Sequence, residues 1–170
     1  MASQAKLISD DYRRLNIDLH AQGQYGLHGR KWATKVTDIA QAIGAATILD
    51  YGCGQGSLRS SMNLPIAEYD PAIKGKDSRP EAADLVVCTD VLEHIEPDYL
   101  NNVIDDLHHL SIKALFAVIS TRPAKKFLAD GRNAHLIVQP QTFWKEIFSK
   151  NFKIVEWEFT NDEVIALLVK

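Results

Sequence analysis

The chain has 170 residues, of which 46% are apolar and 24% are charged, the composition of an ordinary globular protein. At about 150 residues per domain, this length holds one domain with a short extension. The 19 basic and 22 acidic residues give a net charge of −3, so there is no basic field to hold a nucleic-acid backbone by charge alone. A nucleotide or a base as substrate is still allowed.

The cysteine content and the apolar runs limit the cellular setting. Cys53 and Cys88 are the only cysteines, too few for a disulfide framework, and they lack zinc-site spacing. Residues 1–8 have no apolar core of the kind found in secretion signals, and no apolar run approaches the roughly 18 residues of a membrane span. We therefore expect a cytoplasmic protein with no membrane partner.

Residues 1–45 predict an N-terminal helical extension that belongs to the same domain. The first helix is predicted from four apolar residues at helical spacing: Ile8, Tyr12, Leu15 and Leu19. Ser9, Asp10 and Asp11 are candidates for its N-terminal cap or for acids in its first turn. The second has the same spacing and stops at Gly44: Trp32, Val36, Ile39 and Ile43. The glycine-rich joint between them carries three residues that are candidates for closing over a ligand: Tyr25, His28 and Arg30.

From residue 46 to residue 170, apolar runs typical of buried strands alternate with helical patterns. Strands are predicted at 47–51, 65–70, 83–88, 114–119, 152–159 and 163–169, and helices at 58–62, from Pro97 onward and at 142–151. Such alternation predicts a mostly parallel sheet covered on both faces. Because only a turn joins the last two strands, they must be antiparallel. The fold class is therefore a doubly wound α/β sheet of about six strands.

A glycine-rich loop follows the first predicted strand and reads Asp50-Tyr51-Gly52-Cys53-Gly54-Gln55-Gly56. Ligands of doubly wound sheets bind beyond the carboxyl ends of the strands, usually at this first turn. Glycines allow the sharp turn and let the backbone approach a ligand closely. The dinucleotide fingerprint GxGxxG would need a third glycine where Ser57 stands, and the Asp50 carboxylate would repel a pyrophosphate.

The spacing Asp-x-Gly-x-Gly-x-Gly resembles the first motif of the class I S-adenosylmethionine-dependent methyltransferases. Asp70, 20 residues after Asp50, matches the acid that ends the second strand in that family. The segment Thr89-Asp90-Val91-Leu92-Glu93-His94 is similar to the family's "VLEH"-like turn after a later strand. The resemblance spans roughly residues 45–170 and implies a Rossmann-like methyltransferase domain over residues 46–170.

The resemblance also implies S-adenosylmethionine as the cofactor and S-adenosylhomocysteine as the product. Asp50 would help to hold the methionine end, and Asp70 the ribose hydroxyls; the other cofactor-binding candidates are Gly52, Cys53, Gly54, Thr89 and Asp90. The methyl group would move by in-line displacement to an O or N atom of a small or medium-sized acceptor, a reaction in which the protein mainly aligns the reacting groups. The catalytic candidates around the site are Asp90, Glu93, His94 and His135.

Two interpretations of the turn from Asp90 to His94 remain open. A turn of the form acid-x-x-Glu-His binds a divalent metal in some related families, small-RNA 2′-O-methyltransferases and ubiquinone-pathway O-methyltransferases among them. His135 would complete such a ligand set. In other relatives the Glu and His cap the next helix without a metal, so no metal ligand is assigned here.

The sequence departs from the family pattern after Asp70. Only 12 residues, 71–82, separate it from the next predicted strand, so one strand and one helix of the usual fold are expected to be missing. Asp77 is a candidate for the adenine contact that this missing part would supply. Residues 120–140 form a long basic segment without periodicity, either a substrate lid or acid-binding clamp or a plain solvated loop.

Two other functions compete with methyl transfer. The trimmed segment after Asp70 is compatible with a cofactor-binding, non-catalytic partner subunit of a methyltransferase. A nicotinamide-dependent oxidoreductase is disfavoured by Ser57 and by the acid that leads the loop.

Overall fold

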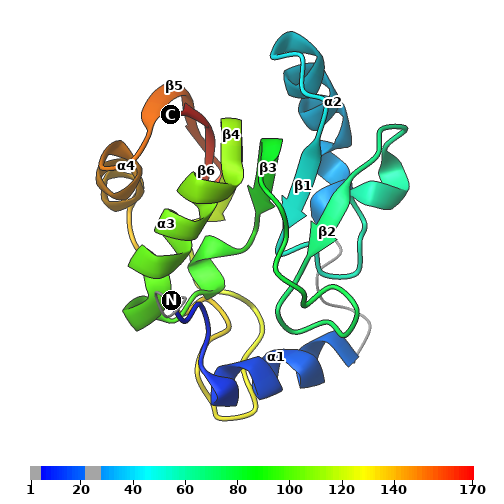
Figure 1. Cartoon of the computed structure of the whole chain (residues 1–170). Helices are drawn as coiled ribbons and strands as arrows, with labels where there is room; N and C mark the ends of the chain where they lie inside the picture. The colour runs from blue at the N-terminus through cyan, green and yellow to red at the C-terminus, as the bar shows by residue number, and fades with distance from the viewer. Residues whose placement is uncertain (1–4, 22–27) are drawn as a thin grey trace.

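A six-stranded mixed sheet forms the centre of the molecule (Figure 1). The computed structural model describes residues 5–21 and 28–170, so Gly23, Tyr25 and Gly26 of the predicted joint lie outside the described residues. The strands are β1 (Ile48–Tyr51), β2 (Ala67–Tyr69), β3 (Ala83–Thr89), β4 (Ser111–Ser120), β5 (Lys153–Thr160) and β6 (Glu163–Val169). Their order in the sheet is β2-β1-β3-β4-β6-β5. The first four are parallel neighbours and β6 is antiparallel to both β4 and β5, which confirms the predicted Rossmann-like α/β fold.

The central strands have the sequence character of strands buried on both faces. Residues 114–120 of β4 are all buried, and β3 is buried along nearly its whole length. Such strands need apolar side chains on every residue, which is why they read as unbroken apolar runs. The edge strand β5, by contrast, has no fully buried residue.

Helices cover both faces of the sheet (Figure 1). The helices α3 (Leu100–Leu110) and α4 (Gln141–Ser149) pack on one face, where Leu107, Trp144 and Phe148 join a core with Val86 and Leu115. The helix α2 (Ala33–Ala42) covers the other face through Val36 and Ile39. Four short 3-10 turns complete the described elements: η1 (His28–Trp32), η2 (Arg59–Ser61), η3 (Leu92–His94) and η4 (Pro97–Tyr99).

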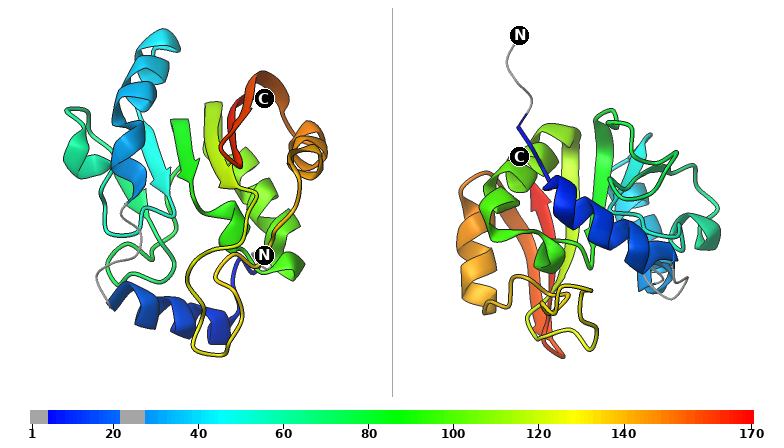
Figure 2. Two further views of the ribbon diagram at one scale, coloured as in Figure 1. Left: turned by 180° about the vertical axis from the view of Figure 1, so that it is seen from behind. Right: turned by 90° about the horizontal axis from the view of Figure 1, so that it is seen from below.

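The strand order reverses at β1, which pairs with β2 on one side and with β3 on the other. The helix α1 (Asp10–Ala21) crosses the carboxyl edge of the sheet at this place, beside the loop of residues 121–140 (Figure 2). Its start is capped as expected, since the Ser9 hydroxyl accepts a hydrogen bond of 3.1 Å from the Tyr12 amide. Tyr12 and Leu19 pack with Leu128 of the loop, so α1 and the loop form one roof over the edge.

Two segments around β2 can be compared with their predictions. The helix predicted at 58–62 is wrong, since the chain makes only the single 3-10 turn Arg59–Ser61. The turn ends at once because the backbone of Met62 is extended, with φ −121° and ψ 149°. The serine hydroxyls bond one turn back without replacing the helical bond, since Gly56 O accepts from both the Oγ (2.9 Å) and the amide (3.1 Å) of Ser60. The trimming after Asp70 is confirmed, because residues 70–82 contain turns but no helix or strand. Among the described residues, no helix is both long and apolar enough to cross a membrane.

Candidate functional site

A cavity of about 660 Å³ opens at the carboxyl edge of the sheet, under the roof of α1 and the loop 121–140. Two walls enclose it. We call residues 50–54 and 70–72 the β1–β2 wall, and residues 89–94 with Ser120, Ala134 and His135 the β3–β4 wall. All of these residues line the cavity except Tyr51, Leu92 and Glu93. The cavity is lined by every residue that the sequence predicts for cofactor binding: Asp50, Gly52, Cys53, Gly54, Asp70, Thr89 and Asp90.

The glycine loop forms the turn of the β1–β2 wall. Gly52 and Gly54 have φ angles of +76° and +52°, the left-handed region that favours glycine. A Cβ atom on Gly52 would lie 2.4 Å from Cγ2 of Val91, so the loop passes too close to the other wall for any side chain. The amides of Gly52 and Cys53 both donate to the carbonyl oxygen of Tyr69, at 2.7 and 3.0 Å. The loop is therefore fastened to the end of β2, directly beside Asp70.

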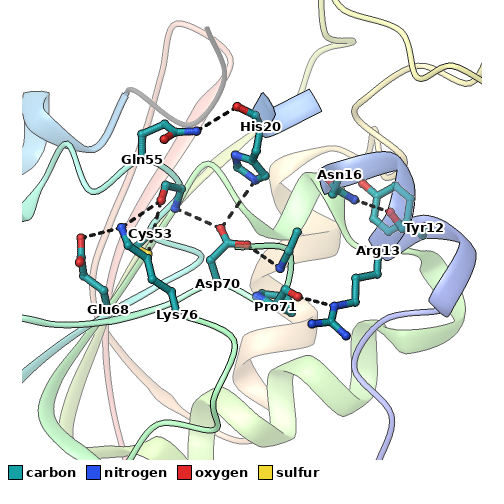
Figure 3. Close-up of polar contacts among 12 residues, drawn as sticks. Tyr12, Arg13, Asn16, His20, Cys53, Gln55, Glu68, Asp70, Pro71 and Lys76 are labelled. Carbon is teal, nitrogen blue, oxygen red and sulfur yellow. Dashed lines mark hydrogen bonds and ion pairs between the residues drawn. The ribbon is translucent and has the colours of Figure 1, made fainter. Parts of the chain in front are cut away.

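Asp70 lies at the centre of this wall (Figure 3). One carboxylate oxygen accepts from the amide of Gly54 at 3.1 Å, and the other accepts from the amide of Ala72 at 2.9 Å. His20 of α1 approaches the same carboxylate, with Nε2 3.8 Å from Oδ2. Two backbone hydrogen bonds thus fix the carboxylate at the cavity surface, and its remaining lone pairs can accept from a ligand.

Asp50 is buried near the carboxyl end of β1 and lines the same wall. No described residue hydrogen-bonds to its carboxyl group in the structure. Burial raises the pKa of Asp50 to about 7, and the nearby Glu68 carboxylate adds to the shift, whereas Lys76 opposes it. A cationic ligand group placed beside Asp50 would restore its charged form.

Asp90 begins the β3–β4 wall in an unusual conformation. Its φ angle is +56°, a left-handed backbone that only a few non-glycine residues adopt. Its amide donates to the carbonyl oxygen of Val118 at 3.0 Å, and its Oδ2 is buried without a hydrogen-bond partner among the described residues. The ring of His28 lies 3.8 Å from that oxygen, and burial raises the pKa of the Asp90 carboxyl. Such strain and unmet hydrogen bonding are typical of functional sites.

Glu93, His94 and His135 come together behind Asp90. Glu93 is fully buried and accepts a hydrogen bond of 2.9 Å from the Ser120 amide through Oε1. Burial, followed by the charge of Asp90, raises the pKa of Glu93 to about 8. Burial also lowers the pKa of His94 to about 3, and the neighbouring His135 adds to the effect. The two imidazole rings meet edge to face with centroids 4.7 Å apart. His94 and His135 reach the cavity surface, whereas Glu93 does not.

Asp77 does not take the place that the sequence suggested. It is not among the cavity-lining residues; its carboxylate forms an ion pair of 2.9 Å with Arg13 and accepts from the Gly75 amide at 3.1 Å. Arg13 also donates to the Pro71 carbonyl oxygen at 2.6 Å, so Asp77 helps to attach α1 to the shortened segment after β2. The hypothesis of an adenine contact by Asp77 is not supported by this position.

Some residues of the predicted joint and of the loop 121–140 line the cavity, and others lie away from it. His28 lines the cavity, Arg30 does not, and Tyr25 lies outside the described residues. Four basic or histidine residues of the loop line the cavity: Arg122, Lys125, Lys126 and His135. Arg132 instead pairs with Asp130 at 2.7 Å, and Asn133 binds the backbone of Ala124 through both ends of its amide group.

Sequence reasoning missed the contribution of α1 to the cavity. Tyr12, Asn16 and His20 line it from above, and the Tyr12 hydroxyl donates to the carbonyl oxygen of His94 at 2.5 Å. The helical pattern shows which residues share a face, but it does not show which surface that face covers. The one sequence feature that indicates this role is the presence of three polar residues, Tyr12, Asn16 and His20, at helical spacing beside the apolar residues of α1.

Comparisons with known proteins bear on the fold. No protein-family model matches the sequence, and a comparison with curated proteins gives no match. Several solved structures are similar. The 1,6-didemethyltoxoflavin-N1-methyltransferase of Burkholderia thailandensis, bound to 1,6-didemethyltoxoflavin and S-adenosylhomocysteine, aligns with a TM-score of 0.66 at 14% identity, over 99% of this chain and 93% of that one.

Two other similar structures were also solved with the cofactor or its product. The N-methyltransferase NodS of Bradyrhizobium japonicum, bound to S-adenosylhomocysteine, gives a TM-score of 0.61 at 18% identity, over 95% of this chain and 99% of that one. The magnesium protoporphyrin IX methyltransferase of Synechocystis, bound to S-adenosylmethionine, gives 0.60 at 18% identity, over 83% and 79% of the two chains. At such identities the similarity establishes the fold, which is that of the class I methyltransferases.

Proposed function

We propose that this chain, which has the fold of the S-adenosylmethionine-dependent methyltransferases, binds that cofactor on its β1–β2 wall and methylates a small acceptor. The observation that carries the proposal is the pair of acids on this wall. Asp50 is buried with no described hydrogen-bond partner, and Asp70 is fixed by two backbone amides at the cavity surface. The first suits a cationic group, and the second suits a diol.

The residues of the β1–β2 wall fit the chemical groups of the cofactor. Asp50 would hold the ammonium group of the methionine end, since an opposite charge removes the cost of burying the carboxylate. Asp70 would accept hydrogen bonds from the ribose hydroxyls, because each of its oxygens uses one lone pair on a backbone amide and keeps others. Gly52 and Gly54 would let the ligand lie against bare backbone.

The β3–β4 wall would position the acceptor. When bound, S-adenosylmethionine supplies a methyl group that is activated by its sulfonium centre, so the protein needs mainly to align the acceptor and exclude water. Asp90 is the group best suited to take a proton from the acceptor, because it faces the cavity and burial raises its pKa. His94 and His135 flank the same space, and the roof of α1 and the loop 121–140 would keep water out.

The acceptor that this cavity suits is small or medium-sized and carries an O or N nucleophile. A volume of about 660 Å³ must hold the cofactor and the acceptor together. The exposed side chains of Arg122 and Lys125 stand at the cavity rim, which favours an acceptor with an acidic group. Similar charge placement on loops over a rigid scaffold is common in binding sites.

Calorimetric titration of the purified chain with S-adenosylhomocysteine and, separately, with NAD⁺ tests the proposal. We expect saturable binding of S-adenosylhomocysteine and none of NAD⁺. Binding of NAD⁺ alone would support an oxidoreductase. Binding of neither ligand would contradict the proposal for this wall. Binding of S-adenosylhomocysteine without release of that product from S-adenosylmethionine, across a panel of small acidic acceptors, would favour the non-catalytic partner subunit.

A further inference from the structure

We propose that Lys76 is a positioning residue for the cofactor site: from behind the β1–β2 wall, its ammonium group holds the glycine loop in the shape that receives the ligand. Lys76 belongs to the shortened segment after β2 and does not line the cavity. Its Nζ donates to the carbonyl oxygen of Gly54 at 3.3 Å (Figure 3). The identity of the ligand rests on the proposed function.

The main chain and the side chain of Lys76 both act on this wall. Its carbonyl oxygen accepts from the amide of Asp70 at 2.9 Å, so the shortened segment folds back onto the end of β2. Gly54 is then held at both of its peptide groups, because its amide donates to the Asp70 carboxylate and its carbonyl oxygen accepts from Lys76. Lys76 therefore connects Gly54 and Asp70, two positions at which the wall would meet the ligand.

A partly buried carboxylate directs the ammonium group toward the loop. The side chain of Glu68 in β2 is 9% exposed, and its Oε1 lies 3.2 Å from Nζ of Lys76. Its Oε2 lies 3.2 Å from Nη1 of Arg59. Solvent and salt screen a partly buried pair much less than an exposed one. Glu68 thus keeps Lys76 in contact with Gly54.

The third glycine of the loop is independent evidence that this place is kept for the ion pair. Gly56 has φ +76° and, unlike Gly52 and Gly54, does not line the cavity. A Cβ atom on Gly56 would collide with Oε1 of Glu68 and would lie 3.1 Å from Nζ of Lys76. Glycine at this position therefore leaves room for the Lys76–Glu68 pair behind the wall.

Lys76 also acts on the charge of Asp50. The titratable groups that face Asp50 are two carboxylates, one ammonium group and two buried thiols: Glu68, Asp70, Lys76, Cys53 and Cys88. Burial and then the Glu68 carboxylate raise the pKa of Asp50, whereas Lys76 lowers it. Without Lys76 the pKa of Asp50 would rise further, so less of the charged form would be present near pH 7 to meet an ammonium group.

Calorimetric titration with S-adenosylhomocysteine compares three variants of the full chain. Lys76→Met keeps an unbranched side chain without the ammonium group, and we expect about 10-fold weaker binding, as for a lost hydrogen bond to a charged group. Lys76→Arg keeps the charge and the donors and should restore most of the affinity. Lys74→Met is the matched control, because Lys74 is an exposed lysine of the same segment, and it should bind as wild type does. Thermal unfolding confirms that the variants fold.

Urea unfolding at several pH values gives a second readout that needs no ligand. A folded-state pKa raised above its unfolded value stabilises the fold at low pH, and this stabilisation is lost as pH rises through the folded pKa. Because the pKa of Asp50 is about 7 in wild type and higher in Lys76→Met, the variant should lose further stability, relative to wild type, from pH 7 to pH 8.5. Lys74→Met should not, and neither should Lys76→Met when Asp50→Asn is present in both chains that are compared.

Three results would overturn the proposal. They are equal binding of S-adenosylhomocysteine by Lys76→Met and Lys74→Met, binding by Lys76→Arg as weak as that by Lys76→Met, and a pH dependence of unfolding that is the same in Lys76→Met as in wild type. If the wild type does not bind S-adenosylhomocysteine, the proposed function fails, and the unfolding data still decide whether Lys76 acts on this wall.

Discussion

The two walls of the cavity satisfy their acidic residues in opposite ways. On the β1–β2 wall, both oxygens of Asp70 accept hydrogen bonds from the backbone. On the β3–β4 wall, one oxygen each of Asp90 and Glu93 is buried without a hydrogen-bond partner among the described residues. The backbone therefore holds Asp70 in place in the free protein, whereas Asp90 and Glu93 each keep an oxygen that no described residue satisfies.

Asp50 is the exception on the β1–β2 wall, and it explains why that wall suits a cation. Its carboxyl group is buried beside Glu68, and its pKa is raised to about 7. A ligand that brings both an ammonium group and a diol meets the two acids of this wall at once. The four predictions below separate the walls by their response to substitution, from the largest expected effect to the smallest.

The largest effect is expected from Gly54→Val. Gly54 lines the cavity at φ +52°, so valine there adds two methyl groups and backbone strain to the cavity wall, and we expect no measurable binding of S-adenosylhomocysteine by calorimetry. Gly44→Val is the matched control. Gly44 has φ +59° at the end of α2, where an added Cβ meets nothing within 4 Å, so this variant has the same backbone strain away from the cavity. Equal binding by the two variants would show that the glycine loop does not contact the ligand.

Asp50→Asn should change the pH dependence of stability. The folded-state pKa of about 7 lies above the unfolded value of 3.8, so the folded chain binds more protons between these limits and wild-type stability falls as pH rises through them. Asparagine does not titrate. We therefore expect the free energy of unfolding of the variant, relative to wild type, to increase by about 3–4 kcal/mol from pH 4 to pH 8. Urea unfolding at several pH values measures this difference.

The same variant should bind S-adenosylhomocysteine more weakly, because the charge that attracts the ammonium group is gone. A relative stability that does not vary with pH would mean that Asp50 is ionised normally in the folded chain. Unchanged affinity would mean that it lies away from the ligand.

Asp70→Ala should weaken binding of S-adenosylhomocysteine by about 1–3 kcal/mol, the contribution of hydrogen bonds to a charged group. Asp106→Ala is a useful control, since Asp106 is another buried acid that accepts hydrogen bonds, from Tyr51 and Arg79, but does not line the cavity. If both variants bind the ligand as wild type does, another residue contacts the ribose.

The smallest effect is expected from His135→Ala on cofactor affinity. His135 belongs to the β3–β4 wall, so S-adenosylhomocysteine should bind within ~0.5 kcal/mol of wild type, as expected for independent sites. A large loss of cofactor affinity would show that the two walls are not separate in function.

The sequence was most informative where one local rule determined the structure. The apolar runs of β3 and β4 predicted strands buried on both faces, and the short turn after β5 required an antiparallel pair. The same holds for the glycine loop, in which Gly52 and Gly54 have the positive φ angles that favour glycine. The helix predicted at 58–62 is shortened to one 3-10 turn because the backbone of Met62 is already extended, a change that apolar spacing does not reveal.

What the sequence could not predict depends on contacts between distant segments. His20 and Asp70 are 50 positions apart, and their approach follows from the path of α1 across the sheet edge. The pairing of Arg13 with Asp77 has the same origin. The sequence did nominate Glu93, His94 and His135, but the orientation of both rings by backbone carbonyls depends on the fold of the loop 121–140.

A crystal structure of the chain grown with S-adenosylhomocysteine tests the central claim most directly. The account predicts the ligand on the β1–β2 wall, with its ribose hydroxyls bonded to the Asp70 carboxylate and its amino group beside Asp50. The sulfur should face the β3–β4 wall. A ligand bound elsewhere, or one whose ribose does not contact Asp70, would contradict the account.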